Sequence, residues 1–381
     1  MLSCQKQLFD IPAHVCYLNT AYMSPQLKAV EEAGQRGLAR KNRPFDILPR
    51  DFFEPAQQLK QQFANFIGVA DSQRIAVVPS VSYGMANVAN NLNLRAGDEI
   101  VLVADQFPSN VFSWERAAKK AGAYIRTVRA PMDKADRGRK WNQAILDAIG
   151  EKTALVALPH IHWSQGIVFD LAAIREKTWK YHALLVVDGT QSVGAYPFSN
   201  VDFQLDTLVC ATYKWLLGPY SFGLAYYGPA FDEGKPIEES WINRLNSEDF
   251  SSLTQYQEQY KRAANRYCVG EYSNFIMVPM AIKALEFLSE WDAAAIQAYC
   301  SNIQAKAIES LLAEGFHIAE AAQRCAHLIG IELPAHLDHQ QLKQRLKQEN
   351  ILVSLRGNFM RVAPYLFNEV SDFEKLLAVL K

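Results

Sequence analysis

The chain has 381 residues, a length that fits two domains or one large domain with an appendage. Hydrophobic residues make up 49% and charged residues 21% of the chain, which is ordinary for a globular protein that folds in water. The formal net charge is -1, from 39 basic and 40 acidic residues, and this balance argues against nucleic acid or another polyanion as a partner.

The six cysteines form no CxxC pair and are too sparse for a disulfide scaffold, which indicates a reducing compartment, the cytoplasm. No cysteine or histidine cluster has the spacing of a metal site, so we expect no metal. The N-terminal segment lacks the apolar core of a signal peptide, and no stretch approaches the roughly 20 apolar residues of a membrane helix. The cysteines are Cys4, Cys16, Cys210, Cys268, Cys300 and Cys325.

Between residues 75 and 230, short apolar runs alternate with longer amphipathic segments. The apolar runs predict buried strands, and the amphipathic segments predict helices that pack on a sheet. Such alternation predicts an α/β fold with a mostly parallel central sheet, whose ligands bind at the carboxyl ends of the strands. The predicted strands cover residues 75–79, 99–104, 153–159, 183–188 and 206–212, and the predicted helices cover 83–92, 110–123 and 171–183.

A second region begins near Pro279 and has the pattern of a smaller α+β domain. Residues 280–315 predict two helices, of which the second ends before Gly315. Further on, three short apolar runs predict strands, and two amphipathic segments predict helices. These strands cover residues 328–334, 351–355 and 358–364, and the helices cover 338–350 and 371–380. We therefore predict a large domain at 16–278 and a small domain at 279–381, with residues 1–15 joining the small domain.

Two segments at predicted strand ends carry candidate chemistry. Asp188 ends an apolar strand, and Gly189 allows a sharp turn after it. Lys214 follows the next strand within TYKWLL, and apolar neighbours would depress the pKa of its amine. A neutral amine is what Schiff-base chemistry requires. Taken singly, Asp188 reads more simply as a cap and Lys214 as a surface lysine, but together they form a pair typical of pyridoxal-5′-phosphate (PLP) sites.

The segments VVDGTQS and TYKWLLGPYSFGLAYY resemble the class V aminotransferase family of fold-type I PLP enzymes, which includes cysteine desulfurases, kynureninases and isopenicillin N epimerase-like proteins. The resemblance extends from residue 17 to residue 368. It implies that Lys214 carries PLP as a Schiff base and that Asp188 pairs with the pyridine nitrogen, keeping the ring an electron sink. It also implies that Gln191 donates a hydrogen bond to the phenolic oxygen of the ring.

The resemblance assigns further residues to the cofactor. A Ser-rich turn before the helix at 83–92 matches the phosphate site, where the backbone of Val81 and the hydroxyl of Ser82 would bind the anion. Phe107 matches the residue that stacks on the ring. Trp163 takes a place where desulfurases have Asn, and Tyr213 lies beside the lysine. No GxGxxG follows a predicted strand, which disfavours a nicotinamide enzyme.

The substrate is expected to be a small amino acid or a related amine with a carboxylate. Arg361 lies in an apolar strand, and a buried arginine needs an anion, which in the family is the substrate α-carboxylate. The match also assigns Asn19 to the substrate. His160 and His162 are candidate acid–base groups, but histidines at strand edges are more often structural.

Two departures from the family pattern qualify these expectations. Desulfurases carry a nucleophilic Cys on a loop before the arginine, whereas residues 351–361 contain none, and Cys325 is badly placed to replace it. At the place where the partner subunit of a homodimer often offers a Thr to the phosphate, this chain has Glu271, with Ser273 or Asn274 as substitutes. A homodimer with the active site near the interface is thus implied by the resemblance.

The predicted function is that of a PLP-dependent aminotransferase or epimerase that deprotonates Cα of its substrate. A kynureninase-like lyase and a non-catalytic PLP-binding protein are the alternatives, and sulfur transfer is disfavoured. An α/β protein without PLP, in which all these residues are structural, remains the third reading of the sequence.

Overall fold

A computed structural model of the protein describes residues 2–335 and 337–380, and its central feature is a seven-stranded sheet in this described part. The strand order is β2-β8-β7-β6-β5-β3-β4, and only β8 runs antiparallel to its neighbours. These strands are β2 (Ile75–Val78), β3 (Glu99–Val103), β4 (Tyr124–Val128), β5 (Thr153–Pro159), β6 (Leu184–Asp188), β7 (Thr207–Ala211) and β8 (Gly223–Tyr227). The predicted α/β fold with a mostly parallel sheet is confirmed.

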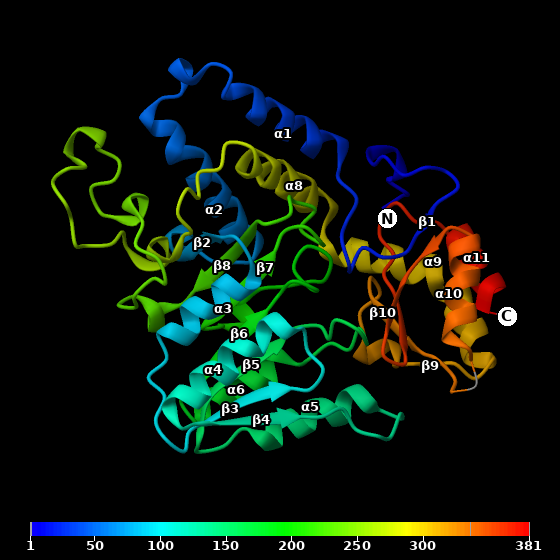
Figure 1. Ribbon diagram of the computed structural model, residues 1–381. Helices are drawn as coiled ribbons and strands as arrows, with labels where there is room; N and C mark the ends of the chain where they lie inside the picture. Colours follow the sequence, from blue (N-terminus) through cyan, green and yellow to red (C-terminus); the bar gives the residue numbers. More distant parts are fainter. Residues whose placement is uncertain (1, 336, 381) are drawn as a thin grey trace.

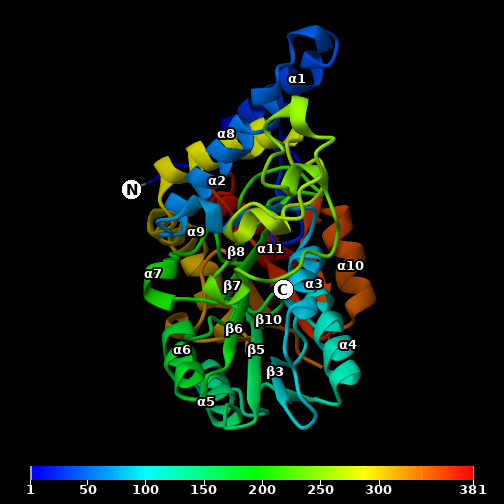
Figure 2. The ribbon, with the colours of Figure 1, turned by 90° about the vertical axis from the view of Figure 1, so that its left-hand side faces the viewer.

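Helices cover both faces of this sheet, as the buried strands require. Figure 2 shows α5, α6 and α7 on one side of the strands and α3 and α4 on the other. The central strands β5, β6 and β7 are rich in apolar residues because neither face meets water. The helices are α3 (Val81–Asn90), α4 (Phe112–Ala121), α5 (Arg137–Ala148), α6 (Leu171–Lys180) and the short α7 (Asn200–Phe203).

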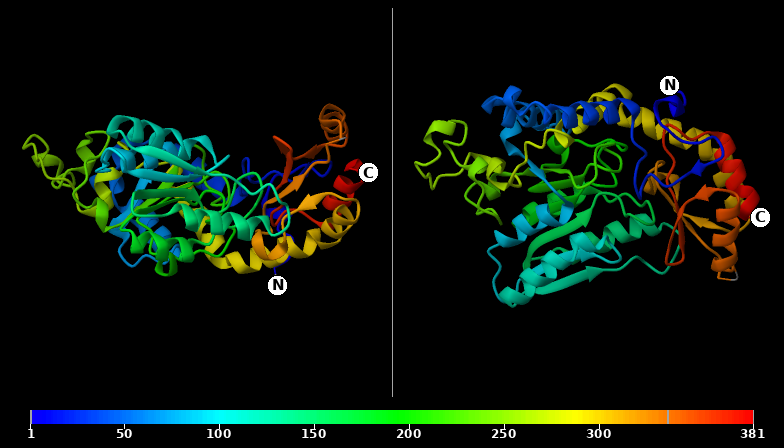
Figure 3. Two further views of the ribbon diagram at one scale, coloured as in Figure 1. Left: turned by 90° about the horizontal axis from the view of Figure 1, so that it is seen from below. Right: turned by 45° about the horizontal axis from the view of Figure 1, so that its top comes forward.

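Several elements of the large region are absent from the sequence-based prediction. The strand β4 lies at the sheet edge with three exposed residues, so it lacks the apolar run that marks a buried strand. The strand β8 follows the Lys214 segment and closes the sheet between β2 and β7. Helices α1 (Lys28–Arg40) and α2 (Glu54–Phe66) precede the first predicted strand, and α8 (Met277–Trp291) packs along both of them (Figure 3).

The C-terminal region contains a four-stranded antiparallel sheet, in the order β12-β13-β10-β9, and three helices (Figure 1). Helix α9 ends just before Gly315, as predicted. The strands are β9 (His317–Ile318), β10 (Ile329–Glu332), β12 (Ser354–Arg356) and β13 (Phe359–Val362), and the helices are α9 (Ala293–Ala313), α10 (His339–Gln348) and α11 (Val370–Leu380).

The N-terminal segment lies against this C-terminal region. The strand β1 (Cys16–Tyr17) pairs in parallel with β11 (Ile351–Leu352), and the Gln5 N–H donates to the Leu366 carbonyl at 2.6 Å. The ring of Phe9 meets that of Phe367 edge-on, with 5.1 Å between centroids. The boundary at residue 279 stays a prediction, since it falls inside α8, which packs on α1 and α2. Over the described residues, every helix is too short or too polar to span a bilayer.

A close contact after β6 holds the lysine-bearing turn in place. Gly194 has φ of +103°, and a Cβ placed on it would lie 2.3 Å from the Trp215 carbonyl oxygen. Trp215 directly follows Lys214, and its indole Nε1 donates to the Gln191 side-chain oxygen at 2.8 Å. The glycine therefore allows two loops at the carboxyl edge of the sheet to touch.

We expect Gly194→Ala to lower the free energy of unfolding by about 3 kcal/mol, because positive-φ strain adds to the steric clash. Gly97→Ala is the matched control, since Gly97 has φ of +92° but open space around its Cα. The control should lose only about 1 kcal/mol. Urea unfolding followed by tryptophan fluorescence measures both values. Equal losses in the two variants would show that the contact with Trp215 does not matter.

Candidate functional site

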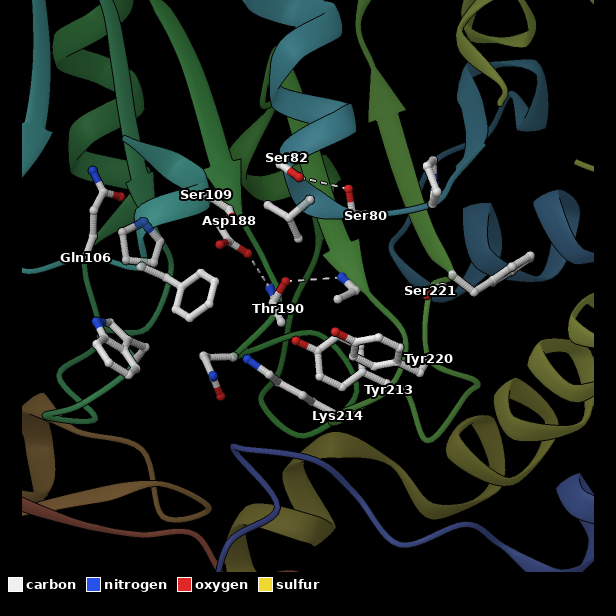
Figure 4. Close-up of a pocket in the computed structure, with 18 residues that line it drawn as sticks. Ser80, Ser82, Gln106, Ser109, Asp188, Thr190, Tyr213, Lys214, Tyr220 and Ser221 are labelled. Carbon is white, nitrogen blue, oxygen red and sulfur yellow. Dashed lines mark hydrogen bonds between the residues drawn. The ribbon is translucent and has the colours of Figure 1, made fainter. Parts of the chain in front are cut away.

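A cavity of about 330 Å³ lies at the carboxyl ends of β5, β6 and β7, beside the start of α3 (Figure 4). This is the edge at which ligands bind in parallel sheets, as predicted. Its volume is in the range of small-molecule sites. The lining residues are Pro79, Ser80, Val81, Ser82, Gln106, Phe107, Ser109, Pro159, Trp163, Asp188, Thr190, Gln191, Ala211, Tyr213, Lys214, Tyr220, Ser221 and Phe222.

Asp188 and Lys214 line this one cavity. Asp188 ends β6 and accepts the Thr190 N–H at 3.0 Å, while burial raises the pKa of its carboxyl group. Burial lowers the pKa of the Lys214 amine to about 8, and the Asp188 charge partly opposes that shift. Figure 4 shows the two side chains entering the same space from neighbouring strand ends. A poorly solvated amine and a carboxyl group thus face one cavity.

The first turn of α3 offers an anion site to the cavity. Ser80 caps the helix by accepting the Tyr83 N–H at 3.2 Å, and its hydroxyl lies 2.9 Å from that of Ser82. Among the hydrogen bonds of the described chain, none uses the N–H groups of Val81 or Ser82. Free N–H groups and the positive end of the helix dipole favour a phosphate.

Aromatic side chains form the walls around Lys214. The Phe107 and Trp163 rings meet edge-on, with 5.6 Å between centroids, and the Lys214 amine nitrogen lies 5.3 Å from the Phe107 ring centre. Tyr213 packs against Tyr220, with 4.7 Å between ring centres. The Trp163 indole N–H donates to the Asp105 carbonyl at 2.6 Å, so its polar atom faces the backbone. These rings exclude water from the amine.

Gln191 lines the cavity, but its amide also has protein partners. Its oxygen accepts the Trp215 indole N–H at 2.8 Å, and its nitrogen donates to the Ala21 carbonyl at 3.2 Å. The amide nitrogen carries a second hydrogen, which is the group that remains for a ring oxygen.

Arg361 lies behind Trp163 and is only 2% exposed. Its guanidinium donates to the Trp163 carbonyl at 3.1 Å and to the Ser354 hydroxyl at 3.4 Å, while its Nε has no partner among the described residues. Burial, with the charge of Arg356 beside it, lowers the pKa of Arg361 to about 10. Asn19 reaches the same cluster, because its side-chain oxygen accepts the Ser354 hydroxyl at 2.8 Å. Both residues adjoin the cavity without lining it.

The structure places other candidates away from the cavity. His160 and His162 are buried, and burial lowers their pKa values to about 3 and about 4, so both rings are neutral. His160 packs among aromatic rings. Asn110, which follows the predicted stacking residue Phe107 by three positions, donates to the Gln106 side chain at 2.8 Å and accepts the Trp114 indole N–H. Burial raises the pKa of the Cys325 thiol to about 12, which keeps it protonated. None of these four side chains lines the cavity, and the histidines are structural.

The three residues considered for a phosphate contact across a dimer also lie outside the cavity of their own chain; they are Glu271, Ser273 and Asn274. They line a hollow of about 250 Å³ beside the end of α1, together with Leu38 and Ile276. Any contact of these residues with a bound phosphate would therefore have to come from a second subunit.

Sequence reasoning missed several polar residues of the cavity. Thr190 follows Asp188 in the DGT turn, and its hydroxyl accepts the Ala211 N–H at 3.1 Å. Gln106 directly precedes Phe107, and its amide donates to the Ala157 carbonyl at 3.3 Å. Proximity in sequence to a recognised motif was the available signal for both, and also for Ser109, two residues after Phe107, and for Ser221, within the segment that contains Lys214. The missed lining residues are Gln106, Ser109, Thr190, Tyr220 and Ser221.

A family model described as Aminotransferase class-V matches residues 24–363. The chain belongs to the class V aminotransferase family. An uncharacterized aminotransferase YcbU from Bacillus subtilis is 27% identical over 326 residues, covering 84% of this chain and 81% of that protein. An isopenicillin N epimerase from Amycolatopsis lactamdurans is 28% identical, covering 63% of this chain and 61% of the epimerase.

Solved structures give the same fold. An apo cysteine desulfurase from Thermococcus onnurineus NA1 superposes with a TM-score of 0.84 at 17% identity, over 100% of this chain and 98% of that chain. A complex of the cystine C-S lyase C-DES with cysteine persulfide has a TM-score of 0.82 at 21% identity, over 97% of each chain. The fold is therefore PLP fold type I, and the protein is a PLP-dependent enzyme of its family.

The residues of the cavity fit PLP. Two unpaired N–H groups at the α3 start suit the phosphate, the Asp188 carboxylate suits a protonated pyridine nitrogen, and the Lys214 amine suits the aldehyde carbon. Phe107 offers a ring face, and the cavity volume admits a small aromatic molecule.

Uptake of PLP by the apoprotein should quicken as pH rises through about 8, because only the neutral Lys214 amine attacks the aldehyde. Asp188→Asn should move this midpoint to lower pH, since the carboxylate favours the charged amine. Asp133→Asn, at an exposed carboxylate that does not line the cavity, should leave it unchanged. Stopped-flow absorbance at a series of pH values measures the rate. A wild-type midpoint near 10.5, the ordinary lysine value, would contradict the burial of the amine.

Proposed function

We propose that the enzyme removes the Cα proton of an amino acid and completes a transamination or an epimerisation. The observation that carries this proposal is the meeting of the Lys214 amine, with its pKa lowered to about 8, and the Asp188 carboxylate in one buried cavity. A base with a pKa near the operating pH is the most effective proton acceptor. The relatives named as an aminotransferase and an epimerase agree with it.

Each residue has a defined part in this proposal. The N–H groups of Val81 and Ser82 hold the phosphate of PLP, Asp188 holds its ring nitrogen and Phe107 packs on its ring. When bound, PLP supplies an electron sink for the charge that develops at Cα. Gln191 offers its remaining amide hydrogen to the ring oxygen, and Tyr213 closes the cavity beside the lysine.

Arg361 binds the α-carboxylate of the substrate, with Asn19 holding the neighbouring Ser354 hydroxyl. A guanidinium that is 2% exposed and makes hydrogen bonds only to neutral oxygens requires an anion to offset its charge. The planar guanidinium suits the two oxygens of a carboxylate. Lys214 would take the Cα proton. A proton delivered to the opposite face of Cα would invert the amino acid, whereas a proton delivered to the aldehyde-derived carbon of PLP, followed by hydrolysis with water, would release a keto acid and leave the amino group on the cofactor.

Sulfur transfer is not part of the proposal. A desulfurase needs a reactive thiolate near the substrate, and no cysteine lines the cavity in the part of the chain described. Five of the six cysteines are buried, and residues 351–361 connect β11 to β13 without a cysteine. The six free thiols agree with a reducing compartment, and we place the enzyme in the cytoplasm.

We expect the PLP-loaded enzyme to exchange the Cα hydrogen of at least one amino acid for deuterium in deuterated water. Proton NMR over a panel of L- and D-amino acids measures the exchange, keto-acid assays detect transamination, and chiral chromatography detects epimerisation. Lys214→Ala should reduce exchange by about 10³-fold or more through loss of the base. Lys119→Ala, at an exposed lysine of α4, is the control. Elimination products would indicate a lyase instead, and no exchange across the panel would indicate a non-catalytic PLP-binding protein.

We also propose a homodimer in which the end of α1 faces the cavity of the partner. Leu38 is 62% and Ile276 is 37% exposed, and both line the hollow that contains Ser273 and Asn274. Apolar side chains gathered on a surface mark contact with another chain. Phe250 is a further exposed apolar residue of this surface, because its ring meets that of Phe52, which lines the hollow.

Sedimentation velocity should give twice the monomer mass for the wild type. The double variant with Leu38→Glu and Ile276→Glu should sediment as a monomer and bind PLP at least 10-fold more weakly, because buried charges oppose association. Met132→Glu, at a residue that is 95% exposed elsewhere, should remain dimeric. A monomeric wild type with full PLP affinity would overturn the proposed dimer.

A further inference from the structure

A second arginine, Arg356, packs on the Trp163 ring together with Arg361. The strands β12 and β13 are antiparallel, and they carry the two arginines toward the cavity from the C-terminal sheet. The guanidinium carbon of Arg356 lies 5.7 Å from the Trp163 ring centre, and that of Arg361 lies 5.6 Å from it. Trp163 itself lines the cavity, so both cations stand one side chain away from Lys214.

The charges of these two arginines are not balanced by protein carboxylates. Neither forms an ion pair with any residue of the described chain within 4.0 Å. The hydrogen bond recorded for Arg356 goes to the carbonyl of its own neighbour Leu355, at 2.9 Å. The charge of Arg356 is felt by Arg361 and by Lys214, and it disfavours the charged form of each. Two guanidinium cations therefore adjoin the proposed substrate space beside Lys214, and in the proposed function Asp188 pairs with the pyridine nitrogen.

We propose that Arg356 binds a second anionic group of the substrate, a side-chain carboxylate, so that the enzyme prefers acidic amino acids. The inference rests on the proposed function, in which Arg361 takes the α-carboxylate. One carboxylate offsets one guanidinium, and a dicarboxylic amino acid offsets both. Arg356 is partly exposed whereas Arg361 is buried, so the α-carboxylate lies deep and the side chain points outward. A partly desolvated arginine discriminates a carboxylate from its neutral amide through charge.

A groove on the outer side of β12 is the rival location for an anion. Arg356 also contributes to this groove of about 430 Å³, which Lys343 and Lys347 of α10 line as well. Both lysines are exposed, so water already solvates their charges. We therefore expect an anion to bind the groove only weakly. The Arg356 guanidinium also packs on the ring of Trp163, which lines the cavity, although Arg356 itself does not line it.

Binding can be tested apart from catalysis with simple acids. Isothermal titration calorimetry of the PLP-loaded enzyme should show glutarate or succinate binding about 10-fold to 100-fold more tightly than valerate or butyrate. Arg356→Gln should remove that difference, and Arg356→Lys should keep part of it. The double variant with Lys343→Gln and Lys347→Gln is the matched control, and it should bind like the wild type. Circular dichroism confirms that each variant is folded.

Turnover gives a second readout with isosteric substrates. For glutamate against glutamine, and aspartate against asparagine, the wild type should favour the acid by about 10-fold or more in kcat/KM. Arg356→Gln should lower kcat/KM for the acids while leaving the amides within about 2-fold. Arg361→Gln should lower both, because acids and amides share the α-carboxylate. The acid with the higher kcat/KM, glutamate or aspartate, shows which substrate side-chain length the enzyme prefers.

The outcomes separate the subsite from the proposed function. Equal turnover of acid and amide by the wild type, or an equal loss for both in Arg356→Gln, would overturn the subsite while Cα exchange upholds the function. Dicarboxylate binding that depends on Arg356 in an enzyme without exchange on any amino acid would overturn the function and keep the subsite. Loss of dicarboxylate binding in the lysine double variant alone would assign the anion to the groove and reject the proposal.

Discussion

Burial of charge at one edge of the sheet is the constraint on which the site depends. The ends of β6 and β7 bring the Asp188 carboxylate and the Lys214 amine into one cavity, where desolvation disfavours the charged form of each. Their mutual attraction partly offsets that cost, and in the proposed function the ring of PLP would give both a partner. The aromatic walls of Phe107, Trp163 and Tyr213 maintain this condition by keeping water away from the amine.

Trp163 joins the two halves of the site. Its ring lies against Phe107, which lines the cavity, and its carbonyl accepts a hydrogen bond from Arg361 behind the cavity. The arginines come from a sheet whose strands follow the lysine by more than a hundred residues, while Asn19 comes from the N-terminal segment. The cluster around Arg361, which we propose binds the substrate, is therefore built where three distant parts of the chain meet. The indole of Trp163 packs against the two guanidinium groups, whereas the Asn that desulfurases have at this position would offer an amide for hydrogen bonds.

Members of the family are named for different reactions, so residues around the cofactor site must account for the differences. Relatives named as an epimerase, an aminotransferase and desulfurases match this one chain. Here the segment before Arg361 carries Arg356 and no cysteine, so that it offers a charge and no thiol nucleophile. The residues at the cofactor are thus compatible with several reactions, and the C-terminal sheet carries the differences.

Local pattern was sufficient for the central architecture. Apolar runs marked β2, β3, β5, β6 and β7 because strands buried on both faces must be apolar, and the edge strand β4 escaped notice because it is not. The DGTQ and YK segments pointed to Asp188, Gln191 and Lys214, which do line one cavity. Burial of His160 and His162 agreed with their expected structural role.

Tertiary structure alone decided the rest. Gln191 forms hydrogen bonds with Trp215 and Ala21, and Arg361 has only neutral partners. Both facts depend on contacts between segments far apart in the chain. The second arginine shows the limit most plainly: in the sequence Arg356 is a charged residue before a glycine, with nothing to set it apart from a solvated one. Its proposed role depends on the strand pairing that places it at Trp163 and on the absence of an ion pair to it within the described chain. Sequence patterns report which residues are buried, whereas the partners of a buried charge are known only when the chain is folded.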